Sequence, residues 1–330
     1  MNVGVYFDLR NPPAWPAEPS RLYGFTLEMC AEADRLGCHS IWLSEHHLFD
    51  DGYLPQPLTM AAAVAARTHQ ARIGTAILIA PIHHAAEIAE QAAIVDIISG
   101  GRLDLGLGTG YRPPEFKLFD TDLHGRYGIT DSRAQELRRL WDGVVTPGPV
   151  QARLPIWMGY QGPKGAARAG RLGEDLLSID PSLWPPFRDA LVAAGHDPTA
   201  ARMAGGINSW ASEDPERDWP TVSKHVAAQF DSYRKHMVDG TDQPVPRPID
   251  PDRLLQREPF SGPLGWFLYG TPEDVATRIR ELVVGAPVET AFFWASIAGM
   301  PEAVVARQVN TICTRLAPLL ADHDPMAAPS

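Results

Sequence analysis

Histidines beside a glutamate are the residues of this sequence whose types and spacing are best suited to chemistry. The stretch Ser44-Glu45-His46-His47 places a carboxylate next to two imidazoles, and His83 and His84 form a second pair. Imidazole titrates near neutrality and can move protons, and imidazole nitrogen together with carboxylate oxygen can also bind a metal ion. These residues therefore indicate either proton transfer or metal binding.

A run of glycines, Gly106-Leu107-Gly108-Thr109-Gly110-Tyr111, is the second feature. In a dinucleotide-binding fingerprint a helix opens at the last glycine, whereas Arg112-Pro113-Pro114 follows here and predicts no immediate helix. Two interpretations stay open. Either the glycines relieve crowding at the neck of the fold, or they let the backbone pass close to a flat ligand.

The segment Gly159-Tyr160-Gln161-Gly162-Pro163-Lys164 predicts the start of a helix that could hold an anion. Pro163 suits the first helical position, where free N–H groups and the charges of Lys164 and Arg168 would converge. An ordinary helix start needs no ligand, so this pattern alone does not decide between an anion-binding site and a helix start without a ligand.

The elements that must position these residues alternate between short strands and longer amphipathic helices, which is typical of a parallel sheet. We expect strands at 3–8, 39–44, 72–79, 102–107, 154–158, 175–179, 203–211 and 288–296, and helices at about 20–37, 58–69, 85–99, 131–143, 163–173, 183–195, 215–237, 272–284 and 302–320. Eight such units predict an α/β fold, the (β/α)8 TIM barrel, with its chemistry at the carboxyl ends of the strands. All of the motifs above fall there.

The length fits one barrel domain over residues 1–330, with two loop insertions. We expect residues 111–130 to form an active-site loop. The insertion at 238–270 either closes over the site as a lid or lies passively on the surface.

The barrel favours proton transfer over metal binding. The first strand ends Phe7-Asp8-Leu9 and the last ends Trp294-Ala295-Ser296, so the ligands typical of barrel metallohydrolases are missing. Neighbouring residues on a strand point to opposite faces, so only one of His46 and His47 can face the barrel mouth. We therefore expect no metal, and hydrogen-bonded structural or surface roles for His47, His83 and His84.

Composition excludes several partners. With 29 basic and 40 acidic residues the net charge is −11, which disfavours nucleic acid and anionic membranes. The longest apolar stretch, 73–82, is shorter than the roughly 20 residues of a membrane helix, and the first residues do not resemble a signal peptide. Three cysteines (Cys30, Cys38 and Cys313) without CxxC spacing indicate neither disulfides nor a thiolate zinc site. We expect a cytoplasmic protein.

Several segments, in one order along most of the chain, match the pattern of a known family. They are Trp42–His47, Ala80–Ala93, Asp96–Gly108, Tyr111–Phe116, Leu154–Gly159, Ala166–Leu172 and Gly270–Val275. Together they resemble the bacterial-luciferase-like flavin-dependent oxidoreductases, a family of (β/α)8 barrels. The resemblance implies a flavin enzyme.

The function implied by this resemblance is a flavin-dependent monooxygenase. It would use reduced FMN and molecular oxygen to oxidise a small organic substrate through a flavin 4a-hydroperoxide, with exchangeable FMN supplied by a separate flavin reductase. A hydride-transfer oxidoreductase that uses the deazaflavin coenzyme F-420 is the alternative, and a non-catalytic flavin-binding accessory subunit is a third. The presence of His46 disfavours the third. We also expect a homodimer.

The resemblance also implies site residues. His46 would transfer the proton, and a non-prolyl cis peptide bond would join Ala76 to Ile77. The flavin ring would lie across the barrel mouth, and the flavin phosphate would bind to the loop after the fifth predicted strand. A substrate pocket is a weaker expectation. The residues expected for the ring are Ala76, Ile77, Gly108, Thr109, Gly110 and Tyr111, for the phosphate Gly159, Tyr160, Gln161, Gly162 and Lys164, and for the pocket Glu45, Trp210, Trp266 and Trp294.

Two departures from the family pattern bear on these roles. Luciferase carries Cys-Arg-Gly where this chain has Gly108-Thr109-Gly110, so a thiol and an arginine contact are missing, and Arg112 or Lys164 is expected to supply the charge. Many relatives also have a second glycine in place of Tyr160. Light emission does not follow from the resemblance.

Overall fold

The computed structural model describes residues 1–260 and 266–327, and it contains the predicted barrel. Every neighbouring pair of strands is parallel, in the order β3-β2-β1-β11-β8-β7-β6-β5-β4, and a further β3–β5 pairing closes the ring. The strands are β1 (Asn2–Phe7), β2 (Ser40–Leu43), β3 (Arg72–Thr75), β4 (Leu78–Ile79), β5 (Leu103–Gly108), β6 (Ile156–Met158), β7 (Asp175–Leu177), β8 (Met203–Ile207) and β11 (Val288–Trp294).

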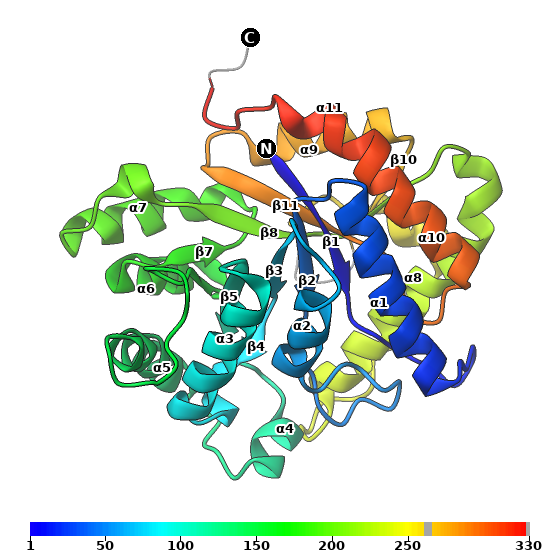
Figure 1. Ribbon diagram of the computed structural model, residues 1–330. Coiled ribbons are helices and arrows are strands. Elements are labelled where there is room, and N and C mark those ends of the chain that lie inside the picture. Colours follow the sequence, from blue (N-terminus) through cyan, green and yellow to red (C-terminus); the bar gives the residue numbers. More distant parts are fainter. Residues whose placement is uncertain (261–265, 328–330) are drawn as a thin grey trace.

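Helices surround this ring of strands on the outside (Figure 1). They are α1 (Pro19–Arg35), α2 (Pro57–Ala65), α3 (Ala85–Ser99), α5 (Arg126–Trp141), α6 (Gly162–Leu172), α7 (Trp184–Ala193), α8 (Pro215–Val238), α9 (Pro272–Val283), α10 (Glu302–Thr311) and α11 (Ala317–Ala321). A π-helical turn at Ile312–Leu316 joins α10 to α11. Within the described ranges, none of the helices is long and apolar enough to cross a membrane.

Two of the predicted strands are interrupted. The strand expected at 72–79 breaks at Ala76–Ile77 into β3 and β4, which both pair with β5 and so form one barrel position. The strand expected at 203–211 breaks at Asn208, and its second half, β9 (Ser209–Ala211), pairs with β10 (Leu268–Gly270). Sequence reasoning had assigned β10 to the insertion.

The segment 111–130, expected to be a loop, contains a short helix. Helix α4 (Pro113–Leu118) begins directly after its N-cap, Arg112. Proline is tolerated in the first turn because the N–H group that it lacks has no partner inside a helix. The helix starts three residues after Gly110, so the departure from a dinucleotide fingerprint still holds.

Large side chains fill the barrel interior. The Trp42 ring stacks on the Phe292 ring with centroids 4.6 Å apart, and it fits because Gly74 opposite has no side chain for it to meet. Ion pairs close the amino-terminal end, where Arg72 donates to Asp104 and Arg202 to Asp175. The open end is therefore the carboxyl end of the strands. The three cysteines are buried free thiols.

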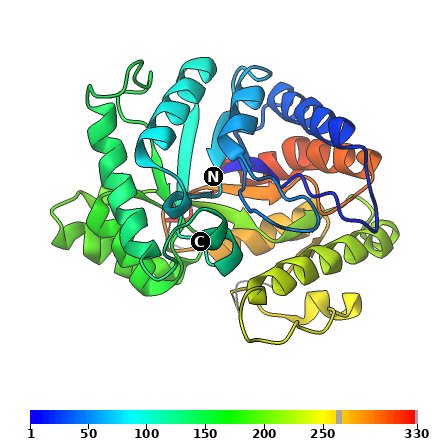
Figure 2. The ribbon, with the colours of Figure 1, turned by 90° about the horizontal axis from the view of Figure 1, so that it is seen from below.

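The described part of the insertion lies beside α8 (Figure 2). The Ile249 N–H donates to the Asp231 carboxylate, and Arg234 on α8 donates to the carbonyl of Arg247. Residues 261–265 of the expected lid lie outside the described residues.

Candidate active site

His46 lies in the loop after β2, where the carboxyl ends of the strands converge. Its Nδ1 atom is 2.8 Å from Oε1 of Glu115, which belongs to α4. The His46 side chain is 12% exposed, whereas the Glu115 carboxylate is fully buried. Burial lowers the pKa of His46, and this outweighs the opposing effect of Glu115. The ring is therefore neutral near pH 7, the state in which it can accept a proton.

Four aromatic rings surround the His46 imidazole. The ring centroids of Phe49, Tyr53, Tyr111 and Tyr233 lie 4.5, 4.9, 5.5 and 6.1 Å from that of His46. The Tyr53 hydroxyl is 2.8 Å from that of Tyr233. The imidazole is therefore packed against a wall of aromatic rings.

A buried arginine after β1 supports the aromatic wall. Arg10 donates from Nε to Asp8 and from Nη1 to Asp51, both at 2.8 Å. Its guanidinium carbon lies 4.0 Å from the centre of the Tyr233 ring, a cation–π distance. Burial raises the pKa of Asp8 to about 6 even though Arg10 is adjacent. Sequence reasoning gave Arg10 no role.

Arg112 ties the site to the end of α8. It donates from Nε to the carbonyl of His236 at 2.9 Å, from Nη2 to Asp239 at 2.9 Å, and from Nη1 to the carbonyl of His47. Its side chain is fully buried by these partners. Arg112 is thus unable to reach a ligand. Of the two residues expected to supply a positive charge to the flavin, Lys164 remains.

The predicted cis peptide bond at Ala76–Ile77 is present. The Ile77 side chain lies between Gly108 and Gly159, and a Cβ atom on either glycine would overlap it. A Cβ atom on Gly110 would lie 2.7 Å from a methyl group of Ile79. The crowding that the first interpretation requires is therefore present at Gly108 and Gly110. Of the residues expected to bind the ring, Gly108 lies against Ile77, and Tyr111 lies by His46.

The expected phosphate loop forms the start of α6. Gln161 is the N-cap and makes no side-chain hydrogen bond to the helix, so the first-turn N–H groups have no cap from this residue. Lys164 is exposed on this turn, whereas Arg168 forms an ion pair with Asp131. Tyr160 is buried and donates to the same Asp131. Lys164 is therefore better placed than Arg168 to meet an anion.

Glu45, expected at a substrate pocket, is instead a buried structural residue. Its Oε1 atom accepts hydrogen bonds from His47 Nε2 at 2.9 Å and His83 Nε2 at 2.6 Å, and Oε2 accepts the Ile79 N–H. The three side chains are close enough to surround an ion, but these hydrogen bonds already satisfy the carboxylate. The hydrogen-bonded interpretation of His47 and His83 is confirmed.

This network predicts a pH dependence of stability. Burial lowers the pKa of His83, but the hydrogen bond and charge of Glu45 outweigh it, so the pKa is raised. A raised pKa stabilises the fold below the ordinary histidine range, and the stabilisation is lost as the pH rises through the folded-state pKa. We expect the free energy of unfolding in urea to fall by about 1 kcal/mol from this source between about pH 6 and pH 9.

The His83→Gln variant should lack this component. The His124→Gln variant, changed at an exposed side chain, should keep it. Equal pH dependence in the wild type and His83→Gln contradicts the assignment.

The tryptophans expected at a substrate pocket pack within the protein. Trp210, Trp266 and Trp294 are only 2%, 6% and 7% exposed. The Trp294 ring lies edge-on to Tyr6, and its Nε1 donates to Asn208 at 3.3 Å. Trp266 packs on Phe260. These contacts favour the packing role.

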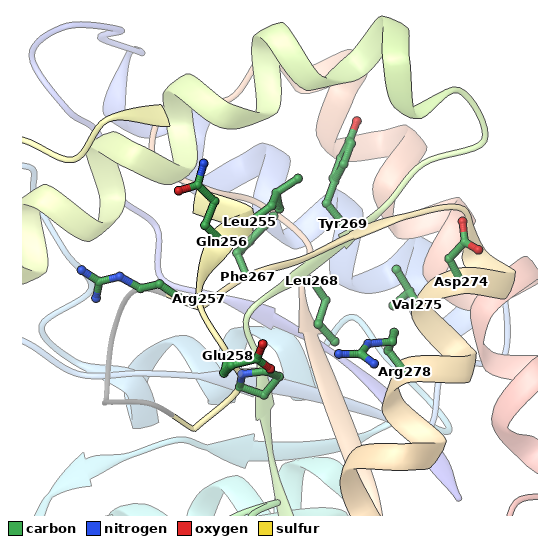
Figure 3. A pocket seen from close by; sticks show the side chains of 11 residues that line it. Leu255, Gln256, Arg257, Glu258, Phe267, Leu268, Tyr269, Asp274, Val275 and Arg278 are labelled. Atoms are coloured by element: carbon green, nitrogen blue, oxygen red, sulfur yellow. The ribbon is translucent and has the colours of Figure 1, made fainter. Parts of the chain in front are cut away.

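None of these three tryptophans lines the pocket of about 310 Å³ that is shown in Figure 3. Its labelled side chains come from the insertion, from β10 and from the first turns of α9. Arg257 and Glu258 contribute opposite charges, as do Arg278 and Asp274. None of the residues predicted from sequence lines this pocket.

Sequence reasoning missed these site residues for two different reasons. Glu115 belongs to a matched segment but received no role, because residues 111–130 were expected to form a loop. Proline followed by an acid in the first turn is a helix-start signal that could have placed it. Arg10 and Tyr233 are brought to His46 by barrel closure and by α8, and no local motif marks them.

Comparison with known proteins agrees with this geometry. The luciferase-like monooxygenase family profile matches residues 1–290. The oxygenase component of a flavin-dependent trigonelline monooxygenase from Acinetobacter baylyi is 42% identical over 171 residues, which is 51% of this chain and 44% of that protein. The match therefore spans less than half of that relative's length.

Two further comparisons extend over most of the chain. An F420-dependent glucose-6-phosphate dehydrogenase from Kineococcus radiotolerans is 24% identical over 292 residues, 79% of this chain and 84% of that protein. The monooxygenase RslO1 from Streptomyces bottropensis has a TM-score of 0.79 at 24% identity, covering 96% of this chain and 99% of that chain, a likeness of fold alone. Because the family profile covers most of its length, this chain belongs to the luciferase-like monooxygenase family.

Proposed function

We propose that this protein is the oxygenase of a two-component system, which uses reduced FMN and molecular oxygen to oxidise a small organic substrate. The observation that carries the proposal is the position of His46, whose imidazole faces the barrel mouth between a buried carboxylate and an aromatic wall. The name of the Acinetobacter relative, an oxygenase component, supports a separate reductase.

The residues of the mouth fit a flavin mononucleotide. The first turn of α6 offers N–H groups without a side-chain cap, and Lys164 adds a positive charge for the phosphate. Partly exposed residues at Ala76–Ile77 and Thr109–Tyr111 provide a surface for the ring. When bound, reduced FMN supplies the two electrons that split oxygen between the substrate and water.

The protein residues supply three things to this reaction. The start of α6 binds the phosphate and so fixes the position of the ring. The rings of Tyr53, Tyr111 and Tyr233 limit the access of water. His46 holds or accepts a proton at Nε2, the atom on the side away from Glu115.

Lys164→Ala should weaken binding of FMN by about tenfold, because one charge-assisted contact to phosphate is lost. Affinity for riboflavin, which has no phosphate, should not change. Arg171→Ala at the other end of α6 is the matched control and should bind both as the wild type does. Fluorescence titration measures all three. An equal loss for both flavins contradicts the phosphate assignment.

The alternative cofactor is the deazaflavin F-420, which the Kineococcus relative supports. The same start of α6 could hold a phosphate of either cofactor. Equilibrium titration with reduced FMN and with reduced F-420 decides between them, and the proposal expects tighter binding of FMN. A non-catalytic accessory subunit is disfavoured by the ordered His46–Glu115 pair, which such a subunit does not need.

We also propose that the protein is a homodimer that pairs through α3. Three isoleucines of this helix, Ile94, Ile97 and Ile98, are 44%, 38% and 46% exposed, an unusual surface for a helix in water. The double variant Ile94→Glu, Ile98→Glu should be monomeric by light scattering, whereas Val192→Glu, at an exposed valine on α7, should stay dimeric. A monomeric wild type contradicts this proposal.

A further inference from the structure

The His46 ring is held from one side by a carboxylate that cannot move freely. Oε1 of Glu115 accepts from His46 Nδ1 at 2.8 Å and from the backbone N–H of His47 at 2.9 Å. Arg112 Nη1 lies 3.4 Å from the same oxygen. The Glu115 side chain is fully buried, so these three contacts fix its position.

The charge on Glu115 determines which ring nitrogen carries the proton. Burial raises the pKa of Glu115, but His46 and the nearby donors outweigh it, so the carboxyl is ionised. An ionised carboxylate only accepts hydrogen bonds, so Nδ1 of His46 must donate. In the neutral ring Nε2 then has a lone pair and no proton.

Nε2 is also the nitrogen that remains accessible. Within residues 1–260 and 266–327 this atom has no hydrogen-bond partner, and it is not among the fully buried polar atoms that lack one. The charged groups that face the ring are Glu115 from α4, Arg112 before it and Arg10 after β1. The two cations disfavour an imidazolium in the resting state.

We propose that Glu115 is a positioning residue, which holds His46 as the Nδ1–H tautomer and so makes Nε2 a proton acceptor towards the barrel mouth. When Nε2 takes a proton from a bound O–H group, the ring becomes an imidazolium and Glu115 stabilises its charge. The proton then passes to solvent. The use of this proton in turnover rests on the proposed function, whereas the tautomer does not.

The test is the 15N NMR spectrum of the ligand-free protein with labelled histidine side chains. The His46 signals are identified by their loss in His46→Gln. We expect Nδ1 to be protonated in the wild type. In Glu115→Leu no oxygen accepts from Nδ1 or stabilises its proton, so the preference for the Nδ1–H tautomer should be lost.

Two further variants guard against a loss of structure. Glu115→Asp keeps the charge and should keep the wild-type tautomer if it reaches His46, while Asp122→Asn changes an exposed carboxylate nearby and should change nothing. A wild-type His46 with its proton on Nε2 overturns the proposal even if no Glu115 variant folds. An unchanged tautomer in folded Glu115→Leu also overturns it.

Turnover separates this proposal from the proposed function. Product formation with reduced FMN should fall at least tenfold in Glu115→Leu with unchanged FMN affinity. If the wild type makes no oxygenated product, the proposed function fails, but the NMR result still stands or falls by itself.

Discussion

Replacing His46 by alanine should lower the rate of product formation by about 10² to 10⁴, while FMN affinity and folding stay close to those of the wild type. The expected reason is the loss of positioned proton transfer at Nε2. Oxygen consumed by reduced flavin then ends as hydrogen peroxide instead of product. The measurement is product and hydrogen peroxide per reduced flavin consumed, with the melting temperature taken on the same preparation.

The control for this experiment is His124→Ala, because the His124 side chain is 96% exposed and has no proposed role in the site. This variant should form as much product per reduced flavin as the wild type does. If His46 serves only in packing, His46→Ala should lose thermal stability while the ratio of product to peroxide stays unchanged. A destabilised but fully coupled His46→Ala contradicts the catalytic assignment.

Gly106→Ala should have the largest effect on stability, a loss of about 3 kcal/mol in the free energy of unfolding. A Cβ atom at this position overlaps the carbonyl oxygen of Thr75 on the neighbouring strand. The backbone has little room to shift, because Thr75 Oγ1 accepts from the Gly106 N–H at 2.9 Å and donates to its carbonyl at 2.8 Å.

The matched control is Gly128→Ala, because Gly128 lies within α5 and an added Cβ meets nothing within 4 Å. Alanine there should stabilise the protein by about 0.5 to 1 kcal/mol, since it lowers the entropy of the unfolded chain. Urea unfolding of both variants compares the two effects. A Gly106→Ala variant as stable as the wild type shows that the barrel neck is less crowded than described.

The barrel could be predicted from sequence because its signal is periodic and repeated. Each strand and the helix after it carries its own apolar pattern, and the carboxyl ends of parallel strands must meet at one mouth. That logic placed His46, Gly108 and Lys164 at or after the carboxyl ends of their strands. Sequence reasoning missed the strand breaks at Ala76–Ile77 and Asn208 and the short strand β10. A hydrophobic pattern does not show where strand pairing stops or with which strand a three-residue strand pairs.

The partners of the site residues were harder to predict than the residues themselves. Glu45 and His46 are adjacent in sequence, yet Glu45 turns to His83 while His46 turns to Glu115. Arg112 has the charge that a phosphate site needs, but its burial among protein acceptors removes it from that role. Such choices depend on the three-dimensional neighbours of each side chain, which no spacing along the chain records.

The reaction of the protein–FMN complex with oxygen tests the central claim most directly. The protein is loaded with reduced FMN without oxygen, mixed with aerated buffer and followed by stopped-flow absorbance. We predict a delayed return of oxidised FMN, with a persistent absorbance band that belongs to neither reduced nor oxidised flavin. Reoxidation in one step at the rate of free reduced FMN, together with tight binding of reduced F-420, would contradict the monooxygenase assignment.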